Sequence, residues 1–444
     1  MHKPISTYFL IFVFTFCLSM NISTNVYSSQ DKNSSSSNLK LQSLLIHLIK
    51  NHEELKSLDS RVEQAKAQYS QSKGLYYPSI DLSADGGREK IDKEFSSDTN
   101  ENRYNVTLRA SQLITDFGKT TNTIKRSGVL LDQARASLES SRQQLMFEGI
   151  KAYINIVRAR ERLKSALNSE ERIKELTGIE KTLVEKGAGL SSDVLQAKSQ
   201  LAGAMALRVE AQGELKLAKN RFFAVFAHFP TKEEVANLKD IEFPYNKLPA
   251  MLDDAIDIAV KQNPELLITR YNDQIAQKDI DISKGAFYPS LNLFGDATRK
   301  DNDAGIAGYS NEFSGGLEFR YNIFNGGGDR AALKSAIASK KSTSYHTQYV
   351  VRIITEQVSN TWEQLSVLKL RSELLDQQAD IVKNFLVLAK KERKMGTRSL
   401  LDVLNGEINY INSIATSISA HQDTKIAAYN LLFSMGDINL ALFE

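Results

Sequence analysis

Apolar residues recur at alternating steps of three and four along the second half of the chain. The stripe comprises Val351, Ile354, Val358, Thr361, Leu365, Leu368, Ser372, Leu375, Ala379, Val382, Leu386 and Ala389. A heptad pattern held for more than five heptads predicts a long helix that packs as a coiled coil. A matching stripe from Leu145 to Ile173 predicts a similar helix in the first half. That helix, expected from about Thr120 to Lys186, would measure on the order of 100 Å, far more than one compact domain requires.

Between the helical stretches the hydrophobic period changes to two, which predicts β-strands. Apolar residues alternate with polar or charged residues from Tyr104 to Ser111 and from Phe313 to Ile323. Their expected partners, Ser79 to Gly86 and Ser290 to Ala297, lie across polar loops. One apolar and one polar face is the pattern of a membrane-spanning barrel strand, and also of a half-buried strand in a soluble sheet.

The chain contains the same structural unit twice. Three landmarks recur in the same order: Gly74–Leu82 as Gly285–Leu293, Gln112–Gly118 as Tyr321–Gly327, and Asp193–Leu195 as Asp402–Leu404. Each copy is predicted to run helix, strand, loop, strand, long helix, turn, helix. Two copies supply four strands, which are too few to close a membrane barrel. Because an open sheet edge cannot face lipid, other subunits must complete the barrel, and three would give twelve strands.

The repeat and the prolines divide the chain into six predicted segments. They are a signal peptide (1–28), a flexible lead (29–38), a first repeat (39–229, strand pair 79–114), a linker (230–249), a second repeat (250–436, strand pair 290–324) and a C-terminal tail (437–444). Pro230, Pro244 and Pro249 mark the linker, where helices are expected to stop.

The first 28 residues carry the features of a signal peptide. His2 and Lys3 precede an apolar run from Tyr8 to Met20, which is too short for a comfortable membrane span. An N-terminal membrane anchor is the alternative interpretation. The single cysteine, Cys17, lies in this segment, so the mature chain would have neither disulfides nor cysteine-bound metal.

Composition and charge exclude several function classes. The formal net charge is +3 and the basic residues form no stripe, so nucleic acid is not an expected partner. The six histidines are scattered, with His47 and His52 five apart, so we expect no metal site and no cofactor. No Ser-His-Asp spacing or carboxylate pair suits a reaction, so the chain is not expected to be an enzyme.

The sequence resembles the TolC family of outer-membrane channels from about Leu39 to Gly436. The resemblance is carried by the doubled unit, the Tyr-Pro-Ser lead into each first strand, Asp116-Phe117-Gly118-Lys119, and the Gly-Thr-Arg segment that opens Gly396–Leu404. It implies a mixed α/β membrane protein: a long coiled-coil α-helical barrel across the periplasm, and four transmembrane strands per protomer that complete a twelve-stranded barrel in a homotrimer. Implied partners are outer-membrane lipid, a periplasmic adaptor (membrane fusion) protein, and an inner-membrane ABC or proton-driven pump.

The resemblance also implies a gate at the periplasmic tip. Asp402 matches an aspartate that projects into the pore, so three copies would form a carboxylate ring that attracts cations. A second gate aspartate of the family falls at Asn405, which implies a weaker ring. Arg398 matches an arginine that ties neighbouring coiled coils together, with Asp193 as its partner, and an aromatic latch residue falls at Arg393. Without the resemblance, Asp402 and Asp193 would be interpreted as helix N-caps or first-turn acids.

The predicted function is a passive outer-membrane channel of a tripartite export system that carries secreted protein or drugs. Asp116–Lys119 resembles type I protein-secretion members more than dedicated drug-efflux members. One alternative is a channel for small-molecule multidrug efflux. A second is a structural coiled-coil surface protein such as a stalk, which would need no amphipathic strand pairs.

Overall fold

The computed structural model describes residues 41–92, 94, 98–243 and 245–443. Met1–Asn38 and Leu39–Glu444 form two separate units, and the described elements all belong to the second. The signal peptide and flexible lead predicted over 1–38 lie outside the described residues.

The two repeats have the same order of elements and helices of equal length. In the first repeat these are α1 (Leu41–Asn51), α2 (Glu53–Gly74), β1 (Ser79–Ile91), β2 (Thr99–Thr115), α3 (Lys119–Glu185) and α4 (Ser191–Phe226). In the second they are α6 (Leu252–Gln262), α7 (Pro264–Gly285), β3 (Ser290–Asp301), β4 (Tyr309–Arg320), α8 (Gly328–Lys394) and α9 (Leu400–Met435). The helices α3 and α8 have 67 residues each, and α4 and α9 have 36 each. The internal repeat predicted from the landmarks is confirmed.

The linker and the strand ends differ in detail from the prediction. A short helix, α5 (Lys232–Asn237), forms inside the predicted linker because Thr231 and Glu234 make a reciprocal capping box. Short 3-10 turns occupy Tyr245–Lys247 in the linker, Asp303–Gly305 between β3 and β4, and Leu440–Phe443 after α9. The second strand pair ends at Arg320 rather than 324, where the β3–β4 pairing ends.

Most of the predicted heptad stripe lies on the buried face of α8, while Val351, Leu368, Leu375 and Val382 are half-buried. Its buried residues are Val350, Ile354, Val358, Thr361, Leu365, Ser372, Ala379, Leu386 and Ala389. This stripe packs α8 against α9, α6 and α7, and α3 packs in the same way against α4, α7 and α2. The main hydrophobic core lies midway along the long helices, where α1, the linker and the end of α9 meet α3.

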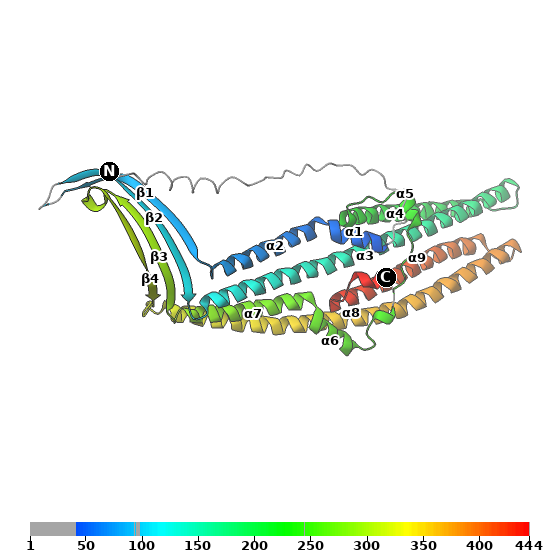
Figure 1. The fold of residues 1–444 in the computed structure, drawn as a ribbon. Coiled ribbons are helices and arrows are strands. Elements are labelled where there is room, and N and C mark those ends of the chain that lie inside the picture. Colours follow the sequence, from blue (N-terminus) through cyan, green and yellow to red (C-terminus); the bar gives the residue numbers. More distant parts are fainter. Residues whose placement is uncertain (1–40, 93, 95–97, 244, 444) are drawn as a thin grey trace. The chain divides into compact units, whose positions relative to one another are not determined.

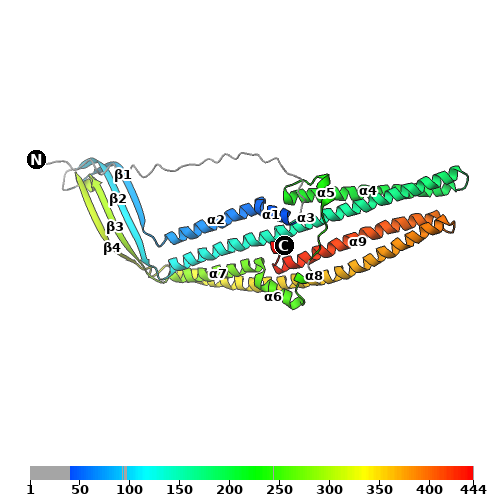
Figure 2. The same cartoon turned by 45° about the vertical axis from the view of Figure 1, so that its right-hand side comes forward.

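The four strands form one antiparallel sheet in the order β1-β2-β3-β4. The central pairing, β2 with β3, joins the two repeats, and its register shifts between Leu113 and Thr115. Figures 1 and 2 show the sheet at one end of the helices and the α3–α4 and α8–α9 hairpins at the other, with α7 between α3 and α8. Across the described residues, no helix has both the length and the apolar character that a membrane crossing requires.

Candidate functional site

One face of the sheet is apolar and exposed across all four strands. Leu82, Leu108, Ala297 and Phe313 are cross-strand partners at one level of this face. Leu82 is 67% exposed and Phe313 is 83% exposed. Such a continuous apolar surface favours contact with lipid rather than water.

The opposite face of the sheet is polar and held by cross-strand charges. Asp81, Arg109, Asp296 and Ser314 are cross-strand partners at one level of this face. Arg109 donates to both carboxylate oxygens of Asp296, with Nε–Oδ1 2.6 Å and Nη2–Oδ2 3.2 Å. Ser314 Oγ donates to the same carboxylate at 3.4 Å. Paired charges of this kind suit the wall of a water-filled passage.

The turns at the tips of the two helical hairpins are built alike. The α3–α4 turn covers 186–190 and the α8–α9 turn covers 395–399. Gly187 and Gly396 adopt left-handed backbone angles, with φ of 77° and 79°. A residue without a Cβ atom is favoured there, because it lets the helix end and the chain reverse without strain. The landmark glycines of the sequence therefore lie at the tips of the two hairpins.

Asp402 and Asn405 lie on the exposed face of α9 beside the tip. Ser399 is the N-cap of α9 and its Oγ accepts from the backbone N–H of Asp402 at 3.1 Å, so Asp402 is a first-turn acid and not the cap. Val403 and Leu404, between the two polar residues, are fully buried. Asp402 and Asn405 thus point away from the core.

Arg398 lies in the α8–α9 turn, and Asp193 lies just after the equivalent turn of the other hairpin. Arg398 Nε pairs with Glu392 Oε2 at 2.5 Å, and its guanidinium lies 5.2 Å from the ring centre of Phe385. Asp193 is in the first turn of α4 and accepts weakly from Ser192 Oγ at 3.5 Å. Within one described chain, Arg398 is therefore engaged by its own hairpin and is not brought to Asp193.

Arg393, the residue at the position of the family's aromatic latch, joins the two hairpins by charge. Its Nη2 donates to Glu180 Oε1 at 2.9 Å, and its Nη1 donates to the carbonyl of Arg398 at 3.3 Å. The Glu180 side chain is only 4% exposed. Arg393 thus makes a charged link between α3 and α8 at the position where the resemblance implies an aromatic latch residue.

Glu407 is a residue that the sequence reasoning missed. It lies on α9 and is fully buried, with both oxygens accepting from Arg172 Nε of α3 at 3.1 and 3.0 Å. Lys390 of α8 pairs with it from the other side. A charged residue within the apolar face of a coiled-coil helix is the signal that could have identified it. The carboxylate connects three helices from both hairpins.

A third ion pair joins the hairpins farther from the tip. Arg158 Nη2 of α3 lies 2.6 Å from Asp423 Oδ1 of α9. Together with Arg172–Glu407 and Glu180–Arg393, it forms what we term the inter-hairpin ladder. Helix α3 supplies one member of each pair, so the ladder runs along this helix toward the tip.

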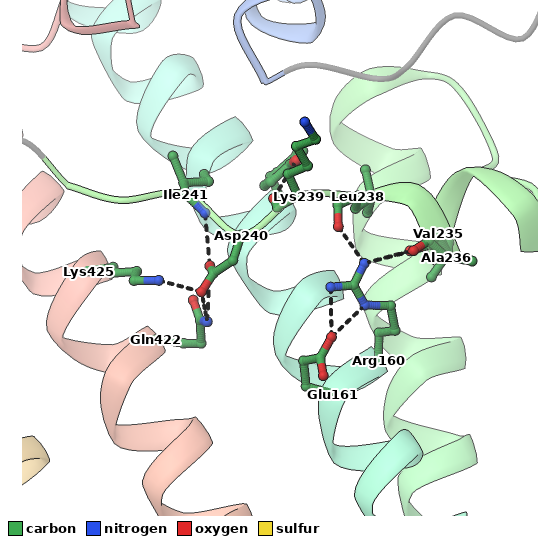
Figure 3. A network of polar contacts seen from close by, with 11 residues as sticks. Arg160, Glu161, Val235, Ala236, Leu238, Lys239, Asp240, Ile241, Gln422 and Lys425 are labelled. Atoms are coloured by element: carbon green, nitrogen blue, oxygen red, sulfur yellow. Dashed lines mark hydrogen bonds and ion pairs between the residues drawn. The ribbon is translucent and has the colours of Figure 1, made fainter. Parts of the chain in front are cut away.

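The linker is bound to α3 by a guanidinium that caps α5. Figure 3 shows Arg160 of α3 directed at the end of α5, where its Nη1 donates to the carbonyls of Val235 (3.1 Å), Ala236 (3.2 Å) and Leu238 (2.5 Å). Glu161 holds the same guanidinium at 2.8 Å. A positive charge at a helix C-terminus satisfies carbonyls that have no partner within the helix.

The same linker segment is also bound to α9, through the side chain of Asp240. Asp240 Oδ2 accepts from Lys425 Nζ at 2.6 Å, and both oxygens accept from Gln422 Nε2 at 3.2 Å (Figure 3). Tyr153 of α3 donates its hydroxyl to the Lys239 carbonyl at 2.8 Å. Burial raises the pKa of the Tyr153 hydroxyl above its ordinary value. We term 235–241 the waist strap, since it joins both hairpins at the level of the main core.

The described residues contain no group of three or more His, Cys, Asp or Glu side chains arranged to hold a metal ion. The arrangement offers one apolar and one polar face of the sheet, and charged helix tips.

A family model described as outer membrane efflux protein matches residues 44–227 and 255–437. The outer membrane efflux protein BepC of Brucella suis is 23% identical over 399 residues, covering 89% of this chain and 85% of that protein. The alkaline protease secretion protein AprF of Pseudomonas aeruginosa is 23% identical over 385 residues, covering 85% of this chain and 77% of that protein.

Among solved structures, the outer-membrane channel OprN superposes with a TM-score of 0.79 at 20% identity, covering 90% of each chain. At this identity the likeness shows the fold alone, and it confirms the arrangement of long helices with four antiparallel strands.

Proposed function

The chain belongs to the outer membrane efflux protein family, and we propose that three copies of it assemble into one channel whose cargo is secreted protein. Members of this family are outer-membrane channels of tripartite export systems that extend into the periplasm, and they are not enzymes. The alternative of a coiled-coil surface stalk does not fit this family.

The observation that carries the assembly proposal is the sheet with two open edges. Strands β1 and β4 each pair on one side only within the described chain. An unpaired edge cannot persist in lipid, because its backbone N–H and C=O groups would lack partners. Three sheets joined edge to edge would form a closed cylinder of twelve strands, with the apolar faces outward and the Arg109–Asp296 pairs inward.

An exposed apolar stripe on α8 supports the same assembly. Val367, Leu374, Ile381 and Leu388 recur every seven residues and are 56% to 68% exposed. They lie on a different side of α8 from the buried stripe, which is already packed against α9. A second heptad stripe with no cover in one protomer indicates a second coiled-coil partner, which we propose is a neighbouring copy.

The gate is proposed to lie where the hairpin tips of the three copies meet. Three Asp402 carboxylates would form a ring that attracts cations, weakened by the neutral Asn405. Arg398 is proposed to reach Asp193 of a neighbouring copy when it leaves Glu392. The inter-hairpin ladder would hold the closed position, because parting the hairpins separates its charges.

Secreted protein is the proposed cargo on two grounds. The relative AprF is named for the secretion of alkaline protease. The Asp116–Lys119 segment also resembles type I secretion members more than drug-efflux members. The second candidate is small-molecule efflux, and the relative BepC is named an efflux protein. A periplasmic adaptor protein and an inner-membrane ABC or proton-driven pump are the proposed partners.

The test compares proteins released into the medium by cells with and without the gene. We expect one or a few large proteins to disappear from the medium and to return when the gene is restored. If cells without the gene release the same set of proteins but are more sensitive to drugs, the cargo is small molecules and not secreted protein. Conductance of the purified protein in a planar bilayer tests the channel itself, whatever the cargo.

A further inference from the structure

Phe117 adopts a backbone conformation that the second repeat gives to a glycine. Phe117 has φ of 54°, and the equivalent Gly326 also has φ of 54°. The next residues, Gly118 and Gly327, have φ of 99° and 83°. A bulky residue in the left-handed region is strained, and glycine at Gly326 makes the same turn without that strain. The turn geometry therefore does not favour phenylalanine at position 117, which indicates that the ring has another role.

The ring of Phe117 stacks on Tyr288 from the other repeat. The ring centres are 5.7 Å apart with an angle of 20° between the planes. Phe117 is 58% exposed and Tyr288 is 54% exposed, so the stack is not a buried core contact. The pair forms an aromatic wall at the junction between the strands and the helices.

This wall borders a shallow pocket of about 420 Å³ that is largely open to solvent. Asn122, Asp281, Lys284 and Gly285 also line it. Gly285 allows the close approach of two helix ends here, since a Cβ atom would lie 2.7 Å from Lys119 Cβ. The pocket thus combines aromatic rings with one ammonium and one carboxylate.

The two charges in the pocket are only loosely paired with each other. Lys284 Nζ lies 3.9 Å from Asp281 Oδ1, at the limit of an ion pair. Asp281 Oδ2 lies 3.5 Å from Lys278 Nζ. An ammonium offers three donors and a carboxylate about four acceptor positions, so both groups retain capacity for a ligand. A ligand with both charges could therefore contact Lys284 through its anionic group and Asp281 through its cationic group.

The pocket lies where the apolar face of the sheet ends. Ile114, three residues before Phe117, is 50% exposed. Leu291, three residues after Tyr288, is the partner of Thr115 near the end of the β2–β3 pairing. Aromatic side chains at the edge of a membrane-spanning surface lie at the level of the lipid headgroups.

We propose that this pocket binds the headgroup of a zwitterionic aminophospholipid, one per protomer. The phosphate contacts the Lys284 ammonium, the lipid amine contacts the Asp281 carboxylate, and the aromatic wall packs against the first methylenes. Gly326 provides no such ring, so the equivalent junction of the other repeat does not form a second site. The inference rests on the proposed function only in placing the apolar face of the sheet in the membrane.

The test titrates the delipidated full-length protein with phosphatidylethanolamine and phosphatidylglycerol of equal chain length, observed by native mass spectrometry. We expect one phosphatidylethanolamine per chain, bound about tenfold more weakly by Phe117→Gly and Lys284→Gln. Phe117→Gly also relieves the strained backbone, so a loss of binding in this variant is not explained by misfolding. Asp281→Asn should abolish the preference for phosphatidylethanolamine over phosphatidylglycerol.

Lys73→Gln is the matched control, because Lys73 is the equivalent of Lys284 in the first repeat and packs over the Tyr69 ring. Its lipid binding should equal that of the unchanged protein. Equal binding of both lipids, unchanged binding by Phe117→Gly, or displacement of lipid by inorganic phosphate at similar concentration would overturn the inference. Bilayer conductance of the same samples separates the two ideas: normal conductance without lipid preference refutes only the pocket, whereas absent conductance refutes the channel.

Discussion

At the scale of single residues, the structure places charges where an uncharged side chain would be easier to bury. Glu407 has no exposed surface, and an isolated carboxylate in that position would be strongly disfavoured. Arg172 and Lys390 compensate it from two other helices, and both side chains are about one-third exposed. The Glu407 carboxylate keeps its contact with Arg172 only while the two hairpins remain together. Parting the tips would therefore leave this buried charge without one of its two partners.

Replacing Glu407 with Gln should loosen the closed tip. The change removes a charge-assisted contact with two cations, so we expect a loss of about 1.5–3 kcal/mol in the stability of the hairpin contact. Bilayer recordings should show a higher open probability. Glu214→Gln is the control, since Glu214 pairs with Arg162 at 2.6 Å within the first hairpin. Similar conductance changes in both variants would remove the gating role of Glu407.

Asp402 and Asn405 give a separate prediction about ion selectivity. Asp402→Ala should reduce the preference for cations, because it removes the carboxylates of the proposed ring. Asn405→Asp should strengthen that preference by restoring the second carboxylate of each copy. Reversal potentials in asymmetric salt measure both effects. If Asp402→Ala and Asn405→Asp do not shift the cation preference in opposite directions, the proposed carboxylate ring is refuted.

At the scale of elements, polar contacts fix helices that apolar packing alone would allow to slide. The waist strap joins α3 and α9 through Arg160 and Asp240. A second contact fixes α7 on α8, where Asp273 pairs with Lys340 and accepts from Ser344 Oγ at 2.8 Å. Burial opposes ionisation of Asp273, but the hydrogen bonds from Lys340 and Ser344 outweigh it and hold its pKa below the usual 3.8.

This lowered pKa predicts an acid-dependent contribution to stability. A group with a depressed folded-state pKa stabilises the protein above its unfolded-state pKa, near 3.8, and loses that effect as the pH falls through the folded-state value. Asp273→Asn should therefore lower stability by about 1.5–3 kcal/mol at pH 7. Thermal unfolding at a series of pH values should show the difference between variant and parent shrinking below about pH 4. A difference independent of pH would contradict the assignment.

The elements themselves were predictable, whereas the contacts between hairpins were not. The heptad stripe of α8 and the alternation around Leu108 depend on local periodicity, which one sequence displays directly. The partner of Arg172 depends on how α3 and α9 pack, and nothing in the local sequence states that register. The same is true of α5, where the Thr231 capping box formed a helix inside a segment expected to lack one. The gate positions were reached by resemblance, and the pairing of Arg398 with Glu392 was not foreseen.

At the scale of the whole molecule, one chain leaves surfaces uncovered that we propose are covered by further copies. The open edges of β1 and β4 and the exposed stripe on α8 are such surfaces. The family is shown by the match over both repeats, and these surfaces explain physically why a single copy is incomplete.

A charge placed in the α8 stripe should disrupt the assembly. Leu374→Glu puts a carboxylate into the proposed contact between copies, so we expect the trimer population to fall at least tenfold. Cross-linking and light scattering of the purified protein in detergent measure it. Gln364→Glu, an exposed polar position outside the stripe, should leave the trimer intact. If the trimer persists with Leu374→Glu, the contact between copies does not include the exposed stripe of α8.

The central pairing of the sheet also constrains the order of folding. Arg109 and Asp296 are joined across the sheet although 187 residues separate them in the chain. The β1–β2 hairpin can form early from neighbouring residues, but the free edge of β2 must wait for β3 (Ser290–Asp301), which follows all of α3 and α4 and the start of the second repeat. During that interval an amphipathic hairpin with an unpaired edge is exposed to aggregation. The chain should therefore depend on periplasmic holding chaperones for longer than a protein whose strands pair only with their sequence neighbours.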